Sequence, residues 1–323
     1  MPSARNKFLL AALLTATLCN PVLAGTDPAH EDSPLGSLPP EPITSSTNIF
    51  KITAKRLFGG EKLPAQLTPM PVGTYALGCL AGAQQLPITG PAWQVMRLSR
   101  NRNWGHPALI SLLERIAQDA KANDDWNGLL VGDMAQPRGG PMLSGHASHQ
   151  IGLDADVWFT PMPDHEMSAA ERETKVPLEM VRSYKELNTD NWSESRAKLI
   201  HTVASQPEVA RIFVNPPIKA ELCKWAKGDR SWLAKIRPYF GHTFHFHVRM
   251  NCPPGATACH NQWVPKPEDG TGCGKELAYW QSDALWNPPK PKPGAPPPPK
   301  PVPKPPLTLA GLPAECRAVI AAP

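Results

Sequence analysis

Three motifs that would place a chain in a well-known class of site are missing from this sequence of 323 residues. No Cys-x-x-Cys pair occurs, which argues against a zinc ribbon. No Gly-x-Ser-x-Gly turn occurs, which argues against a Ser-His-Asp hydrolase built on that turn. His165 and Glu166 begin like an HExxH zinc site, but Ala169 stands where the second histidine should be. A metal site in this chain must therefore use another pattern.

Long apolar runs are also scarce. The one that stands out, Phe8–Cys19, follows Arg5 and Lys7 and precedes the small-residue cleavage signal Val22–Ala24. This arrangement is typical of a secretory signal peptide, predicted over residues 1–24, because the run is too short to span a membrane. No other segment is apolar enough to cross a bilayer, so we expect an exported chain without an integral membrane segment.

The sequence has no large excess of charge of either sign. Its formal net charge is +5 at pH 7, and loss of the signal peptide would remove two positive charges and no negative ones. The remaining positive charge is weak and diffuse, so it gives no reason to expect a nucleic-acid partner.

Cysteines are few but even in number after export. Of the seven, the signal peptide would take away Cys19 and leave six. An even count in an exported chain predicts three disulfides, and the spacing alone leaves fifteen connectivities open.

Composition divides the mature chain into three parts. Residues 25–70 are rich in Pro, Ser and Thr and are expected to form an extended lead-in, whereas residues 71–285 have the composition of one globular domain. Residues 286–323 are expected to form a Pro-rich strap followed by a C-terminal staple. Twelve of the nineteen residues from Pro288 to Pro306 are proline, which favours polyproline II. A disulfide at Cys316 would fold this tail back over the domain.

The domain mixes helical and strand patterns without a regular β-α-β rhythm. We therefore expect an α+β fold, with a central antiparallel sheet, flanking helices and stapling disulfides. Apolar residues at helical spacing predict helices, and short β-rich runs predict strands. The expected helices are 107–123, 194–207 and 216–227, and the expected strands are 128–134, 152–159, 210–216 and 244–250.

One of these strands carries an unusual pair of histidines. In the stretch "GHTFHFHVRM", His245 and His247 alternate with apolar residues, and Arg249 follows on the same face. Two imidazoles on one face of an anchored strand can present a metal ligand and a catalytic neighbour.

A second cluster lies in "SGHASHQIGLDADVWF", which holds His146, His149, Asp154 and Asp156. His149 precedes a tight turn, and the two aspartates share one face of the strand that follows. Imidazole and carboxylate are ordinary Zn²⁺ ligands, and three of them leave a fourth position for water. Polar surface residues would explain either cluster alone, but these two clusters together hold half of the ten histidines.

"GHASHQIGLDAD" together with "HFHVR" resembles the penicillin-insensitive murein endopeptidases, which share HxxxxxxD…HxH with lysostaphin-type, D-Ala-D-Ala-type and hedgehog-type zinc peptidases. The likeness extends to "YALGCLAGAQQLP", "WQVMRLSRNRNWGHP", "LVGDM" and "RIFVNPPIKAELC", and covers about Val72 to Cys316. It implies that His149, Asp156 and His247 bind Zn²⁺, with His146 as a further metal residue.

The resemblance also implies catalytic roles for three histidines: His245 for proton transfer, with His242 and His146 stabilising the oxyanion or sharing the proton. A further metal-binding pair of the family falls at Ser183 and Glu186, so this chain departs from the pattern there. The implied disulfides are Cys79–Cys316, Cys223–Cys273 and Cys252–Cys259.

The implied reaction is hydrolysis of the amide between D-alanine and meso-diaminopimelate in the cross-linked peptides of peptidoglycan, in the periplasm. No serine nucleophile is expected for β-lactams to acylate. A related D-Ala-D-Ala metallocarboxypeptidase is the first alternative. The second alternative, a non-catalytic peptidoglycan-binding module, is disfavoured because every shared motif position is filled.

Overall fold

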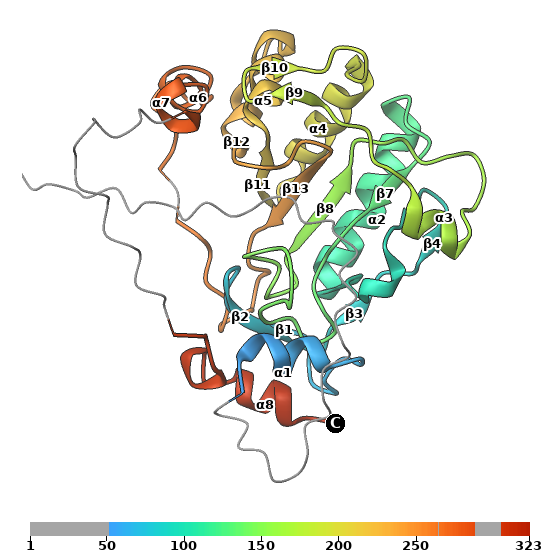
Figure 1. Cartoon of the computed structure of the whole chain (residues 1–323), viewed down its shortest axis with the longest axis vertical. Helices are drawn as coiled ribbons and strands as arrows, with labels where there is room; N and C mark the ends of the chain where they lie inside the picture. Colours follow the sequence, from blue (N-terminus) through green and yellow to red (C-terminus); the bar gives the residue numbers. More distant parts are fainter. Residues whose placement is uncertain (1–51, 264, 288–304) are drawn as a thin grey trace, which may run out of the picture.

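The computed structural model describes residues 52–263, 265–287 and 305–323 (Figure 1). The predicted signal peptide, the lead-in up to residue 51 and the Pro-rich run 288–304 lie outside the described residues.

A seven-stranded sheet forms the centre of the domain, and its inner pairings are antiparallel. β13 lies between β11 and β8, and β8 in turn pairs with β7. The two parallel pairings, β11 with β12 and β5 with β7, lie nearer the edges. The α+β prediction is confirmed, and the sheet is mixed because these outer strands join in parallel. In spatial order the strands are β12 (Ile236–Pro238), β11 (Val209–Val214), β13 (His245–Met250), β8 (Asp154–Trp158), β7 (Leu129–Val131), β5 (Trp93–Val95) and β4 (Thr89–Gly90).

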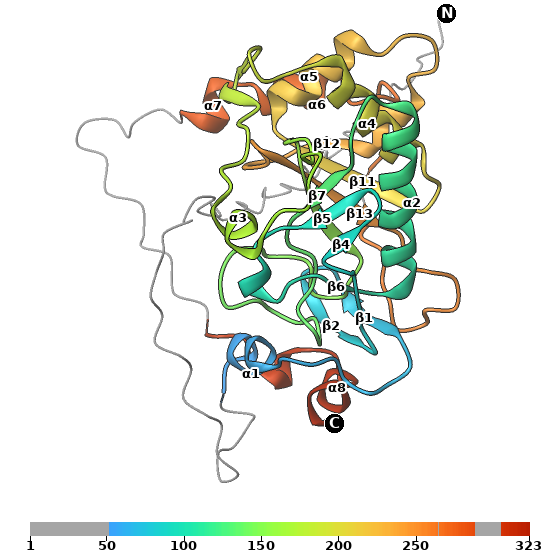
Figure 2. The same ribbon diagram turned by 90° about the vertical axis from the view of Figure 1, so that its right-hand side faces the viewer.

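Helices cover one face of this sheet (Figure 2). They are α2 (Pro107–Asn123), α4 (Glu194–Ser205) and α5 (Pro216–Trp225), which confirms all three predicted helices. His106 is the N-cap of α2, and its side chain accepts a hydrogen bond from the Ala108 amide. Pro107 occupies the first helical position, where a proline is favourable.

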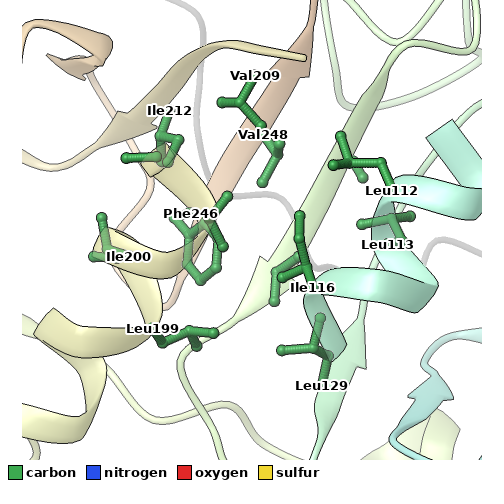
Figure 3. Close-up of a cluster of buried hydrophobic side chains, with 14 of the residues drawn as sticks. Leu112, Leu113, Ile116, Leu129, Leu199, Ile200, Val209, Ile212, Phe246 and Val248 are labelled. Carbon is green, nitrogen blue, oxygen red and sulfur yellow. The ribbon is translucent and has the colours of Figure 1, made fainter. Parts of the chain in front are cut away.

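The core lies between these helices and the inner strands (Figure 3). Phe246 and Val248 of β13 are fully buried against apolar side chains of α2 and α4. Each such side chain contributes about 1.5–3 kcal/mol on burial. Since strand residues alternate, this anchoring turns His245, His247 and Arg249 to the opposite face of the sheet.

A second, smaller core holds the two chain ends together. α1 (Ala54–Gly60) and α8 (Cys316–Ala321) pack against the hairpin of β1 (Met70–Thr74) and β2 (Leu77–Ala81). Part of the segment expected to be extended is thus a helix with one buried face. The disulfide Cys79–Cys316 crosses this core, and Cys223–Cys273 and Cys252–Cys259 also form, so the implied pairing is confirmed.

The remaining elements are short. Two small hairpin-like sheets pair β3 (Gln84–Gln85) with β6 (Trp104–Gly105) and β9 (Val181–Ser183) with β10 (Glu186–Leu187). No helix in the described ranges has the length and apolarity needed to cross a membrane. The other helices are α3 (Ala169–Thr174), α6 (Lys275–Trp280), α7 (Asp283–Trp286) and the 3₁₀ turns Leu98–Arg100, Ser231–Lys235 and Leu309–Gly311.

Candidate active site

Strand register brings the two predicted clusters together. β13 and β8 pair antiparallel so that His247 lies opposite Asp156 and Arg249 lies opposite Asp154. These side chains share the sheet face that the helices leave free, because Phe246 occupies the other face. Two sequence segments about ninety residues apart therefore meet at one point.

Three donor atoms at this point have the spacing of a tetrahedral metal site. His149 Nε2 is 3.2 Å from His247 Nδ1 and 3.5 Å from Asp156 Oδ1, and the last two are 3.2 Å apart. Ligands at about 2.0–2.1 Å from a tetrahedral ion lie about 3.3–3.4 Å from one another. Asp156 Oδ1 is buried and has no hydrogen-bond donor among the described residues, so its lone pairs are available to a metal ion.

The other predicted histidines surround this group. His146 Nδ1 is 3.5 Å from Asp156 Oδ2, and His146, His149 and Asp156 each offer one donor within 4.8 Å of the others. His245 Nε2 is 3.7 Å from Asp156 Oδ2, and the His242 ring centroid lies 5.1 Å from that of His245. All six predicted residues converge, and their separate roles stay predictions.

Two of these histidines sit in the left-handed backbone region, where non-glycine residues are uncommon. His149 has φ +67° and His242 has φ +54°. Such conformations cost about 1–3 kcal/mol each and cluster at functional sites. Gly152, with φ +68°, completes the turn after His149, and a Cβ there would lie 2.3 Å from Leu80 Cδ2.

Sequence reasoning missed the role of Asp154, which contacts both histidines that are predicted to bind the metal. Its fully buried carboxylate accepts the His149 backbone N–H at 3.0 Å and lies 3.1 Å from His247 Nε2. A bidentate ion pair with Arg249 completes the network at 2.8 and 3.0 Å. Burial alone would raise the pKa of Asp154, but Arg249 and His247 hold it well below its usual range. The available signal was the spacing of two residues on each strand: Asp154 shares a face with Asp156, and Arg249 shares a face with His247.

Sequence reasoning also missed Asp133, which fixes His146. Asp133 Oδ2 lies 2.9 Å from His146 Nε2 and accepts hydrogen bonds from Arg102 at 2.8 Å and Arg100 at 3.2 Å. A hydrogen bond at Nε2 directs Nδ1 of His146 toward Asp156. Despite burial, the carboxylates Asp156 and Asp133 raise the pKa of His146. An acidic residue just after the buried strand β7 was the available signal.

Burial keeps three of the site's imidazoles neutral near pH 7. It lowers the pKa of His149 to about 4 and lowers the pKa values of His245 and His242 as well. Neutral rings have a lone pair that can bind a metal or accept a proton. Burial would also lower the pKa of His247, but Asp154 and Asp156 raise it.

The positions of the family's further metal pair lie elsewhere. Ser183 and Glu186 face each other on the exposed β9–β10 hairpin, where Glu186 forms an ion pair with Arg182. Within the described part of the chain, no second group of metal-binding side chains forms around them.

His146, His149 and Asp156 form a group of two imidazoles and a carboxylate that is compatible with a metal ion. Such a group, bordered by further imidazoles, is typical of metal-dependent hydrolases. The chain matches the model of the penicillin-insensitive murein endopeptidases over residues 71–321. It belongs to this family, as the sequence motifs predicted.

Named relatives support the assignment. The penicillin-insensitive murein endopeptidase of Haemophilus influenzae is 48% identical over 221 residues, which is 68% of this chain and 74% of that protein. The corresponding protein of Klebsiella pneumoniae subsp. pneumoniae is 41% identical over 221 residues, 68% of this chain and 77% of its own length. That of Yersinia enterocolitica is 41% identical over 232 residues, 72% of this chain and 82% of its own length.

Proposed function

We propose that this chain is a zinc-dependent murein endopeptidase that hydrolyses the D-alanyl–meso-diaminopimelyl amide of peptidoglycan cross-links. Family membership supports the reaction class. The observation that carries the metal assignment is the triangle of donor atoms from His149, His247 and Asp156, with sides of 3.2–3.5 Å. Nitrogen and carboxylate donors at tetrahedral spacing suit Zn²⁺, and His146 is the neighbouring candidate for a further contact.

When bound, Zn²⁺ would act as a Lewis acid toward the scissile carbonyl and the attacking water. The chain must then supply a group that moves protons, and no glutamate lies in the cluster of donors. His245 is the proposed group, because its buried Nδ1 has no partner among the described residues and its pKa is lowered by burial. As a neutral imidazole it can take the water's proton and return it to the leaving amine.

His242 and His146 have distinct proposed roles in proton sharing and in stabilisation of the oxyanion. His242 Nδ1 lies 2.7 Å from the Phe240 carbonyl and donates to it, which leaves Nε2 as an acceptor near His245. His146, held by Asp133 and with a raised pKa, suits stabilisation of negative charge on the substrate oxygen.

A periplasmic location is part of the proposal. The predicted signal peptide supports export, and three disulfides are typical of an oxidising compartment. The proposed partner, the cross-linked peptide of peptidoglycan, is found outside the cytoplasm.

The test is digestion of purified muropeptides by the purified protein, with and without chelator and with zinc added back. We expect cross-linked dimers to become monomers, activity to disappear with chelator and to return with zinc. Intact dimers together with removal of terminal D-alanine from monomers would instead identify a carboxypeptidase.

Variants separate the proposed roles of the two strand histidines. His247→Ala should lose zinc by metal analysis, whereas His245→Ala should retain zinc and lose about 10²–10⁴-fold in turnover. His260→Ala, an exposed histidine outside the site, is the control that should keep both properties. Full activity in His245→Ala would refute the proton-transfer assignment.

A further inference from the structure

A second row of charged side chains crosses the same sheet face as the metal-ligand residues. Strand pairing places Arg211 opposite Arg249 and Arg249 opposite Asp154, two residues along from the His247–Asp156 pair. Two residues of a strand span about 7 Å. The Arg249–Asp154 pair is therefore one side-chain step from the proposed metal, and Arg211 lies one strand farther across the sheet.

A pocket of about 400 Å³ lies at this row. The start of β11, the end of β13 and the loop after β13 line it, and Lys235 closes one side. Asn251 and Gln262 contribute amide groups to the wall. Trp263 also belongs to the lining and is 82% exposed, so a large aromatic surface faces solvent at the pocket.

The two arginines of this pocket differ in whether an acid balances their charge. Arg249 is neutralised by its ion pair with Asp154, but Arg211 has no carboxylate within ion-pair distance among the described residues. Arg211 is 9% exposed, and the one hydrogen bond of its side chain within the described ranges goes from Nη2 to the Gln262 carbonyl at 2.7 Å. Lys235 Nζ likewise donates only to backbone carbonyls, at 2.7 and 2.8 Å.

Such an arrangement is costly without a ligand. Burial, together with Arg249 and Arg237, lowers the pKa of Arg211 to about 10, so its surroundings disfavour the cation. A buried charge is stabilised by a hydrogen-bonded partner of opposite sign. The guanidinium group fits a carboxylate well, because its N–H groups can donate two parallel hydrogen bonds.

We propose that this pocket is a carboxylate-binding subsite, in which Arg211, supported by Lys235, holds an acidic group of the stem peptide and Trp263 packs on its apolar part. The inference rests on the proposed function and names a specificity determinant of that site. Cross-linked stem peptides carry free carboxylates near the scissile amide. Arg211 lies two residues along and one strand across from His247, about 8–9 Å in all. Since an extended peptide advances about 3.3 Å per residue, the bound carboxylate would lie two to three residues from the bond that is cut.

The test is a binding measurement that requires no hydrolysis. The probe is the tripeptide L-alanyl-γ-D-glutamyl-meso-diaminopimelate, which contains no cross-link, and a second probe has all its carboxylates amidated. By titration calorimetry, amidation should weaken binding to the native chain at least tenfold, as for a lost hydrogen bond to a charged group. Arg211→Gln should weaken binding of the free tripeptide to the same degree and remove the preference between the two probes.

Control variants make the result specific. Arg56→Gln removes the same charge from an exposed position on α1 and should leave both affinities unchanged. Arg211→Lys should recover part of the preference, and Trp263→Ala should weaken both probes. Circular dichroism checks folding of each variant. If neither Arg211 variant folds, equal binding of the two probes by the native chain still overturns the proposal.

Two results overturn the subsite directly. One is that Arg211→Gln binds the free tripeptide with native affinity. The other is that Arg211→Gln still prefers the free tripeptide to the amidated one, which would place the bound carboxylate elsewhere, as on the metal. Loss of the endopeptidase activity is a separate outcome. A chain that fails to cut dimers but shows the Arg211-dependent preference refutes the proposed reaction and keeps the subsite. A chain whose Arg211→Gln variant cuts dimers with native KM keeps the reaction and refutes the subsite.

Discussion

Replacement of Asp154 by Asn should disturb metal binding and folding together. The carboxylate contacts the backbone of His149, the ring of His247 and the guanidinium of Arg249 at 2.8–3.1 Å. Asn keeps the shape and removes the charge. The His247 ring then loses the anion that orients it, and Arg249 keeps its buried charge without a carboxylate to balance it.

Both losses can be given a size. Loss of the partner that orients a metal-binding histidine typically costs 10- to 100-fold in metal affinity. Removal of one partner of a buried ion pair costs about 3–5 kcal/mol of folding free energy. Solvent screening offers little relief here, since the side chains of Asp154 and Arg249 are 0% and 7% exposed.

The effect also has a defined pH window. The pKa of Asp154 is depressed in the folded chain, so its contribution is present above the unfolded value of about 4 and is lost as pH falls. The stability deficit of Asp154→Asn should therefore be constant from pH 7 to about pH 5 and shrink in stronger acid.

Two measurements test these expectations. Competition with a chelator gives the zinc affinity, and urea unfolding of the metal-free protein gives the free energy of unfolding. Asp190→Asn is the control, because its exposed pair with Arg182 should contribute at most about 1 kcal/mol. A variant with native zinc affinity and a stability loss below about 1 kcal/mol would refute the reasoning.

Two further predictions concern stability. Joint replacement of Cys79 and Cys316 by Ser should lower the free energy of unfolding by about 2–5 kcal/mol, since the bond closes a long loop with a sequence separation of 237 residues; an unchanged urea midpoint would contradict this. Burial lowers the pKa of Lys219 to about 7 from 10.5, so the unfolded chain binds more protons between these values and stability should rise with pH across that window. The rise, at most about 5 kcal/mol by the same linkage, should be absent in Lys219→Met when both proteins are unfolded in urea at pH 7 and pH 10.

Much of the active site could be predicted because strand alternation is local. The repeat of two in β8 and β13 assigns His245, His247 and Asp156 to faces without knowledge of the fold. Their meeting depends on which strands pair, and this is set by packing between segments distant in the chain. The sequence order gives no direct sign that β13 lies between β8 and β11.

Other features depended on contacts that no local pattern encodes. Leu57 and Phe58 lie in a segment with the composition of a lead-in, yet they are buried against Leu309 and Val319 because the C-terminus returns to β2. The charged partners Asp133 and Asp154 belong to the same category. Asp133 and Asp154 have their roles only through groups that folding brings close to them. The sequence shows an acidic residue in a β-rich run, but it does not show which side chain that residue will contact.

The proposed ligand arrangement would make metal binding and sheet pairing mutually dependent. A shift of one residue between β8 and β13 would send His247 to the helix side of the sheet and Phe246 to the metal side. Burial of Phe246 against α2 and α4 therefore fixes the register that the metal requires. Conversely, a metal that binds the folded chain stabilises it by RT ln(1 + [M]/Kd), about 4 kcal/mol at a thousandfold excess over Kd. The pairing of β8 with β13 should consequently resist amide exchange more strongly with zinc than with chelator, and β1–β2, in the separate small core, should show the smaller change.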